Sequence, residues 1–232
     1  MIVKIADIVF EAKLRYKYTF DMCSAYLYDG DEKPAFTTFA SNEQIADERK
    51  KNPGFPDYII ENTCIYRNIC HEMLKFNAIF IHSAAICVDN EAYLFSANSG
   101  TGKTTHINLW LEKFGDRAFI INGDKPILRM INDTIYAYGT PWCGKELQNK
   151  NVRVPLKSIC ILERGSENII EPANKNEAAI FLLSQTTRPK DKVLAELMLE
   201  KLEMLVNSVP IYKLHCNMEK EACEVSYNTM SK

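Results

Sequence analysis

The stretch "AYLFSANSGTGKTTHINLWLEKFG", residues 92 to 115, constrains the fold of this chain more than any other segment. An apolar run is followed by a loop with two glycines, and the loop leads into a segment with helical periodicity. The apolar residues recur at the i, i+3, i+4, i+7 spacing of a one-faced helix, at Ile107, Trp110, Leu111 and Phe114. Gly115 stands where such a helix would end. The segment therefore predicts a strand, a loop and a helix in direct succession.

The loop has the residues of a phosphate-binding loop, with Ala97 in place of the usual first glycine. Gly100 and Gly102 can adopt positive φ, which lets backbone N–H groups converge on phosphate oxygens. A helix that begins near Lys103 adds the partial positive charge of its N-terminus. In this pattern the Lys103 ammonium binds the β- and γ-phosphates, and the Thr104 hydroxyl binds Mg²⁺.

The structural alternative is a glycine-rich turn that only starts a helix. The apolar strand before the loop and the one-faced helix after it favour a nucleotide site, because the motif requires that context. We therefore expect ATP and Mg²⁺ as cofactors. The residues expected to bind the nucleotide are Asn98, Ser99, Gly100, Thr101, Gly102, Lys103, Thr104 and Thr105.

Residues 1–76 are predicted to form a small N-terminal α+β subdomain. The alternating patterns "IVKIADIVFEA" and "SAYLYDG" favour antiparallel strands, with turns at Asp29-Gly30-Asp31 and Lys33-Pro34. Ser41 and Gln44 form a capping-box pattern for a short helix through Lys51. Residues 57–76 are compatible with a second helix.

Residues 77–232 are predicted to form the core. Its fold class is α/β (α+β mixed): a mixed β-sheet flanked by helices. "AIFIHSAAICVDNEAYLFSA" indicates two strands with a turn, and "AFIIN", "KPILRMI", "TIYAYGT", "VPLKSICILERG" and "NIIEPA" indicate further strands. A long amphipathic helix is predicted behind Pro189, followed by a strand in "VPIYKLHC" and a C-terminal helix.

Composition excludes several classes of protein. The formal net charge of -2 gives no basic excess for binding nucleic acid. No apolar tract is long and uninterrupted enough to span a membrane, and the start of the sequence does not look like a secretory signal, so a cytoplasmic protein without membrane partners is expected. None of the eight cysteines has C-x-x-C spacing, which favours buried free thiols.

The order of His82, the phosphate loop and Asp124 resembles the catalytic half of HPr kinase/phosphorylase and the phosphoenolpyruvate-carboxykinase-like P-loop kinases. The resemblance is carried by "FIHSAAICVDNEAYLFSANSGTGKTTH", "INGDKPILR" and "YGTPWCGKE", and more loosely by "LSQTTRPKDK". These segments are similar to a subgroup of small bacterial kinase-like proteins related to that family. The resemblance implies a PEP-carboxykinase-like P-loop kinase core.

Two segments depart from the family pattern. The family's adjacent acidic pair is reduced to Gly123-Asp124, and its acidic-arginine signature is replaced by the segment 139–145, "GTPWCGK". Both departures argue against phosphorylase activity and against HPr itself as the substrate.

Asp124 is placed opposite the loop by the resemblance, where it could accept the proton of an acceptor hydroxyl or hold Mg²⁺. The alternative is an aspartate that caps a turn. His82 is either a core histidine or, as the resemblance implies, a hydrogen-bonding partner of Asp124 or of the transferring phosphoryl group.

Two cations are candidates for stabilising charge on the phosphoryl oxygens. Lys145 lies in the "GTPWCGK" turn, beside an expected exposed Trp142 and a partly exposed Cys143 thiol, and the alternative is a turn with a structural role alone. Arg188 precedes Pro189 and could form a second clamp, with a solvated loop arginine as its alternative. Arg164 has weaker support still.

This set of residues suits phosphoryl transfer, which depends on positioning and charge stabilisation. The sequence therefore favours an ATP- and Mg²⁺-dependent kinase with a hydroxyl acceptor, most simply a serine of a peptide or small protein. A small-molecule kinase and a catalytically inactive nucleotide-binding regulator stay open as alternatives, and so does a homo-oligomer. A decarboxylating carboxykinase is disfavoured by the length of the chain.

Overall fold

Strands and helices follow one another along the chain in the order of a mixed α/β protein. The computed structural model describes residues 1–232. The strands are β1 (Ile2–Ile5), β2 (Ile8–Lys13), β3 (Thr37–Phe39), β4 (Ala78–Phe80), β5 (Ser83–Val88), β6 (Glu91–Ser96), β7 (Ala118–Asn122), β8 (Ile127–Ile131), β9 (Thr134–Tyr138), β10 (Arg153–Arg164), β11 (Ile169–Pro172) and β12 (Ile211–Cys216). The α-helices are α1 (Lys17–Met22), α2 (Asn42–Lys51), α3 (Asp57–Met73), α4 (Lys103–Phe114), α5 (Lys175–Ser184), α6 (Lys192–Ser208) and α7 (Lys220–Met230). The 3₁₀ turns are η1 (Ser24–Tyr26), η2 (Leu74–Phe76) and η3 (Gly115–Arg117).

The long strand β10 joins the parts of the main sheet. Its first residues pair antiparallel with β9, and its later residues pair in parallel with β6 and with β12. The strand order is β4-β8-β9-β10-β6-β5-β7, with β12 also beside β10 and β11 beside β12. A register shift between Leu156 and Ser158 lies where β10 pairs with β6, and such bulges bend a strand. The predicted mixed sheet flanked by helices is confirmed.

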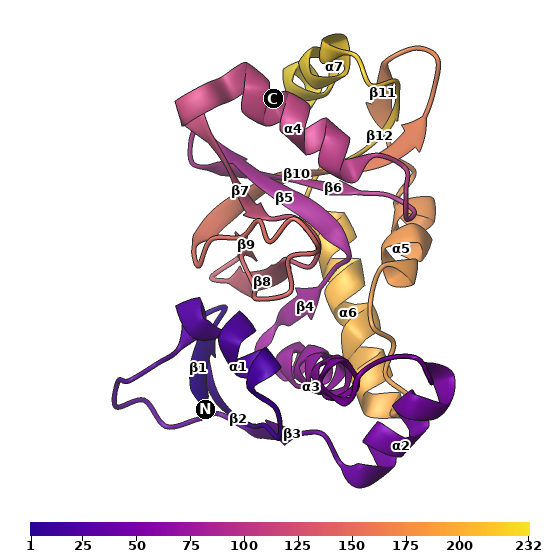
Figure 1. Ribbon diagram of the computed structural model, residues 1–232. Coiled ribbons are helices and arrows are strands. Elements are labelled where there is room, and N and C mark those ends of the chain that lie inside the picture. The colour runs from indigo at the N-terminus through magenta and orange to yellow at the C-terminus, as the bar shows by residue number, and fades with distance from the viewer.

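Helices cover both faces of this sheet. Figure 1 shows α4 and α7 on one side of β5 and β6, with α5 and α6 on the other. Side chains of β6 alternate between two apolar clusters: Leu94 joins the cluster under α5 and α6, whereas Tyr93 and Phe95 join the cluster under α4 and α7. This is the period-two alternation of a strand buried on both faces. None of the helices combines the length and the apolar character that crossing a membrane requires.

The N-terminal residues form a second, three-stranded sheet. β1 and β2 pair antiparallel across Ala6 and Asp7, both with positive φ, and β3 pairs in parallel with β2. A third apolar cluster joins this sheet and α3 to β4 and β8, through residues such as Ile60, Phe80 and Ile127. This cluster contains residues from both sides of position 76. The division of the chain into two domains at that position stays a prediction.

All five predicted helices are confirmed. The capping box of α2 is present, with Gln44 N–H donating to Ser41 Oγ (3.1 Å) and Ser41 N–H donating to Gln44 Oε1 (3.0 Å). The predicted helices after residue 57, after the loop, behind Pro189 and at the C-terminus correspond to α3, α4, α6 and α7. The sequence did not predict α1 or α5.

The predicted strand in "SAYLYDG" is wrong. This segment contains the 3₁₀ turn η1. Cys23 and Tyr26 are both buried, and a spacing of three residues places them on one side of such a turn. The alternation in this segment therefore reflects one helical turn and an exposed Leu27 rather than a strand. The segment predicted to hold two strands contains three, because β4 precedes His82 and β5 follows it.

Two leucines of α6 provide a test of the packing under the sheet. Leu202 is 3% exposed and belongs to the cluster under α5 and α6, whereas Leu199 on the same helix is 52% exposed. We expect Leu202→Ala to lower the free energy of unfolding by about 2–5 kcal/mol, because it leaves a cavity. Leu199→Ala should change it by less than about 1 kcal/mol. Urea denaturation monitored by circular dichroism measures the free energy of unfolding of both variants. Equal losses of stability in the two variants would contradict this packing.

Candidate functional site

The loop between β6 and α4 is open towards solvent. Gly100 has φ 76° and Gly102 has φ 122°, so both adopt the positive φ that the sequence predicts. No other heavy atom lies within 4 Å of the position that a Cβ would occupy on either glycine. The space beside both glycines is therefore free to receive a ligand.

Two cations bond to the backbone of this loop. The Lys103 Nζ donates a hydrogen bond to Ala97 O (3.1 Å), so the side chain folds back over the loop. Burial lowers the pKa of Lys103, and the nearby charge of Asp124 acts in the opposite direction. Arg164, at the end of β10, donates to Gly100 O (2.6 Å). Arg164, which the sequence supports only weakly as a site residue, thus fixes the loop to the sheet.

A polar cavity of about 390 Å³ lies on one side of the loop. No hydrophobic residue lines it. Residues from four separate parts of the chain meet there: His82, Ser99, Gly100, Gly102, Lys103, Thr104, Gly123, Asp124, Gly144, Lys145 and Glu146. The structure therefore brings together most of the residues that the sequence singled out.

Asp124 follows β7 and presents its carboxylate to this cavity. Its Oδ1 lies 3.1 Å from His82 Nε2, and its Oδ2 accepts a hydrogen bond from Lys125 Nζ (2.6 Å). Burial alone would raise the pKa of Asp124, but the hydrogen bonds from His82 and Lys125 outweigh burial and hold the pKa well below its usual range. The side chain that caps the turn belongs to Asn122, whose Oδ1 accepts from the backbone N–H groups of Asp124 (2.9 Å) and Lys125 (2.7 Å). The Asp124 carboxylate is thus not used as a turn cap.

His82 lies between β4 and β5 and is held from both sides. Its Nδ1 is 3.1 Å from Gln185 Oε1, and its backbone N–H donates to Gln185 O (2.8 Å). Its own carbonyl oxygen accepts from Ser96 Oγ (3.1 Å). These contacts orient the imidazole so that Nε2 faces Asp124.

The turn at 139–146 is anchored by its apolar residues. Trp142 is 6% exposed; its ring packs against those of Tyr66 and Phe80, and its Nε1 donates to Asn62 Oδ1 (3.3 Å). Cys143 is 5% exposed, and burial raises the pKa of its thiol. The expectations of an exposed Trp142 and a partly exposed Cys143 are therefore wrong, because this part of the turn packs into the core.

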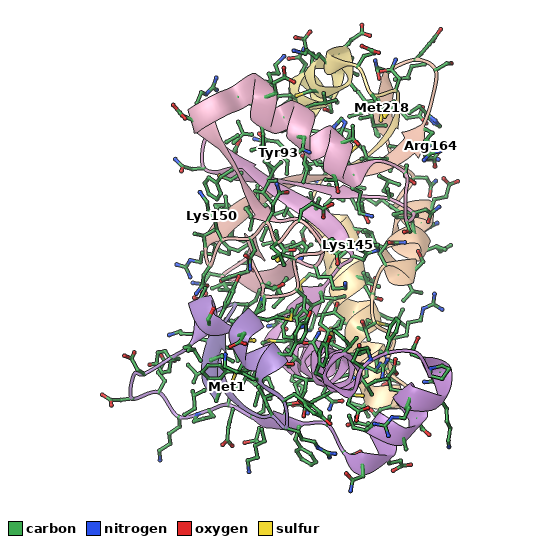
Figure 2. The ribbon with its side chains drawn as sticks, viewed as in Figure 1. Met1, Tyr93, Lys145, Lys150, Arg164 and Met218 are labelled. Atoms are coloured by element: carbon green, nitrogen blue, oxygen red, sulfur yellow. The ribbon has the colours of Figure 1, made fainter.

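The residues after Cys143 have a different environment. Lys145 and Glu146 are exposed and line the polar cavity. Figure 2 shows Lys145 near the middle of the molecule, whereas Arg164 and Met218 lie together beside the C-terminal elements.

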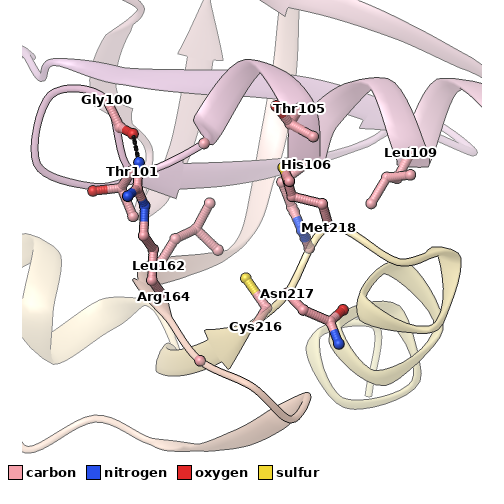
Figure 3. A pocket seen from close by; sticks show the side chains of 12 residues that line it. Gly100, Thr101, Thr105, His106, Leu109, Leu162, Arg164, Cys216, Asn217 and Met218 are labelled. Atoms are coloured by element: carbon pink, nitrogen blue, oxygen red, sulfur yellow. Dashed lines mark hydrogen bonds between the residues drawn. The ribbon is translucent and has the colours of Figure 1, made fainter.

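A second cavity of about 550 Å³ lies on the other side of the loop. It shares Gly100 and Gly102 with the polar cavity and has a mostly apolar lining that includes Leu109, Leu162 and Met218. Figure 3 shows Arg164 bonded to Gly100 at one side of this cavity and Leu109 at the other. Thr101 and Thr105 line this cavity rather than the polar one. The loop thus forms a boundary between a polar and an apolar space.

Two predicted residues are not brought to either cavity. Arg188 is exposed and lines neither of them. Asn98 is also exposed, and its carbonyl oxygen accepts from Thr101 N–H (3.2 Å).

Sequence reasoning missed three residues around Asp124. Glu146 supplies a second carboxylate in the polar cavity, Lys125 pairs with Asp124, and Gln185 holds His82. Glu146 could have been selected as an acidic residue next to Lys145 in a glycine-containing turn. Gln185 gives no such signal, because its role depends on the contact between two segments far apart in the sequence.

The polar cavity fits a magnesium ion bound together with a nucleotide. No three His, Cys, Asp or Glu side chains gather into a metal-binding group. Mg²⁺ in kinases, however, is commonly held by one or two carboxylates together with phosphate oxygens and water. Asp124, Glu146 and the Thr104 hydroxyl line the same cavity and are oxygen ligands of the required kind.

Comparisons with known proteins find a distant structural likeness. No protein-family model and no curated protein matches the chain. Among solved structures, the HPr(Ser) kinase/phosphatase from Coxiella burnetii matches over 66% of this chain and 92% of its own, with 10% sequence identity and a TM-score of 0.36. At this degree of likeness we draw neither fold nor function from that protein.

The depressed pKa of Asp124 predicts a pH-dependent contribution to stability. A carboxyl group whose pKa is lowered on folding stabilises the folded state above its unfolded pKa of about 4, and this contribution is lost as the pH falls below that value. We expect Asp124→Asn to be less stable than the wild type at pH 7, with the difference shrinking between about pH 5 and pH 3. Urea denaturation across this range measures it. The exposed Asp133, with Asp133→Asn, serves as the control, and a deficit that does not change with pH would contradict the assignment.

Proposed function

We propose that this chain is an ATP- and Mg²⁺-dependent kinase that transfers the γ-phosphoryl group to a hydroxyl, most simply a serine of a peptide or small protein. One observation carries the proposal: the Asp124 carboxylate, the Lys103 ammonium and the glycines of the open loop line a single polar cavity. Phosphoryl transfer needs this combination of a phosphate cradle, a cation and an acidic group.

In the proposed complex, each of the two cavities holds one part of the nucleotide. The loop glycines face both spaces, so a triphosphate bound along the loop can place its γ-phosphate in the polar cavity. The nucleoside then occupies the larger cavity, where Leu109, Leu162 and Met218 offer apolar contacts for a base. Lys103 releases its bond to Ala97 and binds phosphate oxygens instead.

The residues around the γ-phosphate have distinct roles in the proposed transfer. The acceptor oxygen bonds to the γ-phosphorus while the bond from that phosphorus to the β-phosphate oxygen breaks. Asp124 orients the acceptor hydroxyl and takes its proton, and His82 holds the carboxylate in position. Lys103 and Lys145 stabilise charge on the phosphoryl oxygens. Mg²⁺ bound by Asp124, Glu146 and Thr104 would neutralise phosphate charge.

The low pKa of Asp124 makes it a weak base before substrates bind. This property is compatible with a loose transition state, in which little negative charge must be generated on the acceptor oxygen. Arg188 lines neither cavity, so a role as a second clamp would require its loop to move on binding.

A nucleotide-binding regulator without catalytic activity is the second candidate. Lys125 Nζ lies 2.6 Å from Asp124 Oδ2 while His82 faces Oδ1, so both oxygens of the expected base are engaged. For a kinase, Lys125 has to move away from Asp124 when the acceptor or Mg²⁺ binds. For a regulator, the ion pair stays closed.

Transfer of labelled phosphate separates the two candidates. We expect incubation with γ-labelled ATP and an arrayed library of serine-containing peptides to label acceptors. Asp124→Asn should lower turnover about 10²-fold or more, the usual effect of removing an acid or base, with ATP affinity largely retained. Asp133→Asn, a matched change at an exposed turn, should leave turnover unchanged. ATP binding without label on any acceptor would favour the regulator, and equal turnover in Asp124→Asn would remove Asp124 from this role.

A further inference from the structure

The outer edge of β3 is not paired with another strand. β3 pairs with β2 only, and no strand lies on its other side. Glu11 N–H donates to Phe36 O (3.0 Å), and backbone groups alternate in direction along a strand, so those of Thr37 and Phe39 point away from β2. Asn68 Nδ2 donates to Phe39 O (2.9 Å) from α3, as this direction requires. The N–H and C=O groups of Thr37 and the N–H of Phe39 thus face outward.

A groove of about 470 Å³ runs beside this edge. β3 forms one wall, the start of α2 and the last turns of α3 form the other, and Leu194 of α6 lies at its border. Figure 1 shows β3 and α2 at the end of the molecule away from the loop between β6 and α4. The groove is therefore separate from the candidate active site.

Two polar atoms in the walls of the groove have no hydrogen-bond partner. Thr38 Oγ1 and His71 Nε2 are buried and unpaired, and the third such side-chain atom in the chain is His106 Nδ1. Thr38 and His71 both line the groove, and Thr38 is only 3% exposed. A buried polar atom without a partner is unfavourable, because it has lost its hydrogen bonds to water. Both atoms are closed off from solvent in the free chain, so a ligand in the groove can bond to them only after the walls of the groove shift.

The charge and the apolar surface of the groove indicate what that ligand is. Glu43 lines the groove without an ion-pair partner, and Glu72 is bonded only to Lys75. Phe39 is 56% exposed at the same place. An acidic groove beside an open strand edge matches an extended peptide that has basic and apolar side chains.

We propose that β3 and α3 form a docking groove for an extended peptide segment, which pairs with β3 as an additional strand and directs basic side chains towards Glu43 and Glu72. The link to catalysis rests on the proposed function: the segment then belongs to the phosphate acceptor, at a distance from its serine. Main-chain hydrogen bonds to Thr37 and Phe39 supply affinity, and the two carboxylates supply selectivity.

Selection from a random dodecapeptide display library against the full chain tests the proposal. We expect enriched peptides with basic residues, and affinity for the synthetic peptides is measured by fluorescence anisotropy. Glu43→Lys and Phe39→Asp should each weaken binding at least about fivefold. Glu43→Lys replaces an attraction for basic side chains with a repulsion, and Phe39→Asp removes an apolar contact. Glu203→Lys on the exposed face of α6 and Phe55→Asp, which is 54% exposed outside the groove, serve as matched controls.

Two further measurements separate docking from catalysis and test the strand pairing. Lys103→Ala should bind the peptides as the wild type does. Peptide docking can therefore be confirmed even if the chain proves not to transfer phosphate. Bound peptide should slow hydrogen exchange at the Thr37 and Phe39 amides. The proposal is overturned if no peptide is enriched, if the groove variants bind as well as the controls, or if exchange at these amides does not change.

Discussion

The candidate site depends on a loop backbone that stays open while it is fixed at two points. Positive φ at Gly100 and Gly102 gives the loop its course, and the absence of other atoms beside them leaves room for phosphate. The buried face of α4 fixes one end through Trp110 and Ile107, and Arg164 of β10 fixes the loop at Gly100 O. A side chain at either glycine would strain the backbone and fill the space. The rest of the site is arranged around this loop.

The sheet brings distant parts of the chain to the loop. β10 pairs with both β6, which leads into the loop, and β9, which leads into the turn at 139–146. Burial of Trp142 fixes that turn and directs Lys145 and Glu146 to the cavity. Asn122 caps the turn after β7 and so leaves the Asp124 carboxylate to His82 and Lys125. Structural roles are thus filled by neighbouring residues, and the charged groups are available to a ligand.

The sequence predicted what depends on local pattern. The strand, loop and helix around Lys103, the capping box at Ser41 and the long helix α6 follow from periodicity and from residues at fixed spacing. It could not predict features that depend on tertiary packing. "SAYLYDG" alternates like a strand but buries Tyr26 on a 3₁₀ turn, and Trp142 is buried by partners from α3 and β4. Gln185 contacts His82 although the two residues are far apart in the sequence, and no sequence motif links them. The roles of the site residues stay predictions.

Binding of magnesium-ATP measured by isothermal titration calorimetry tests the central claim, that the loop is a phosphate cradle, most directly. The wild-type chain should give saturable heat with 1:1 stoichiometry. Lys103→Ala should bind at least about tenfold more weakly, because a charge-assisted hydrogen bond contributes about 1.5–3 kcal/mol. Lys113→Ala, at the far end of the same helix, should bind as the wild type does. No saturable heat with the wild type, or equal affinity in the two lysine variants, would contradict the account.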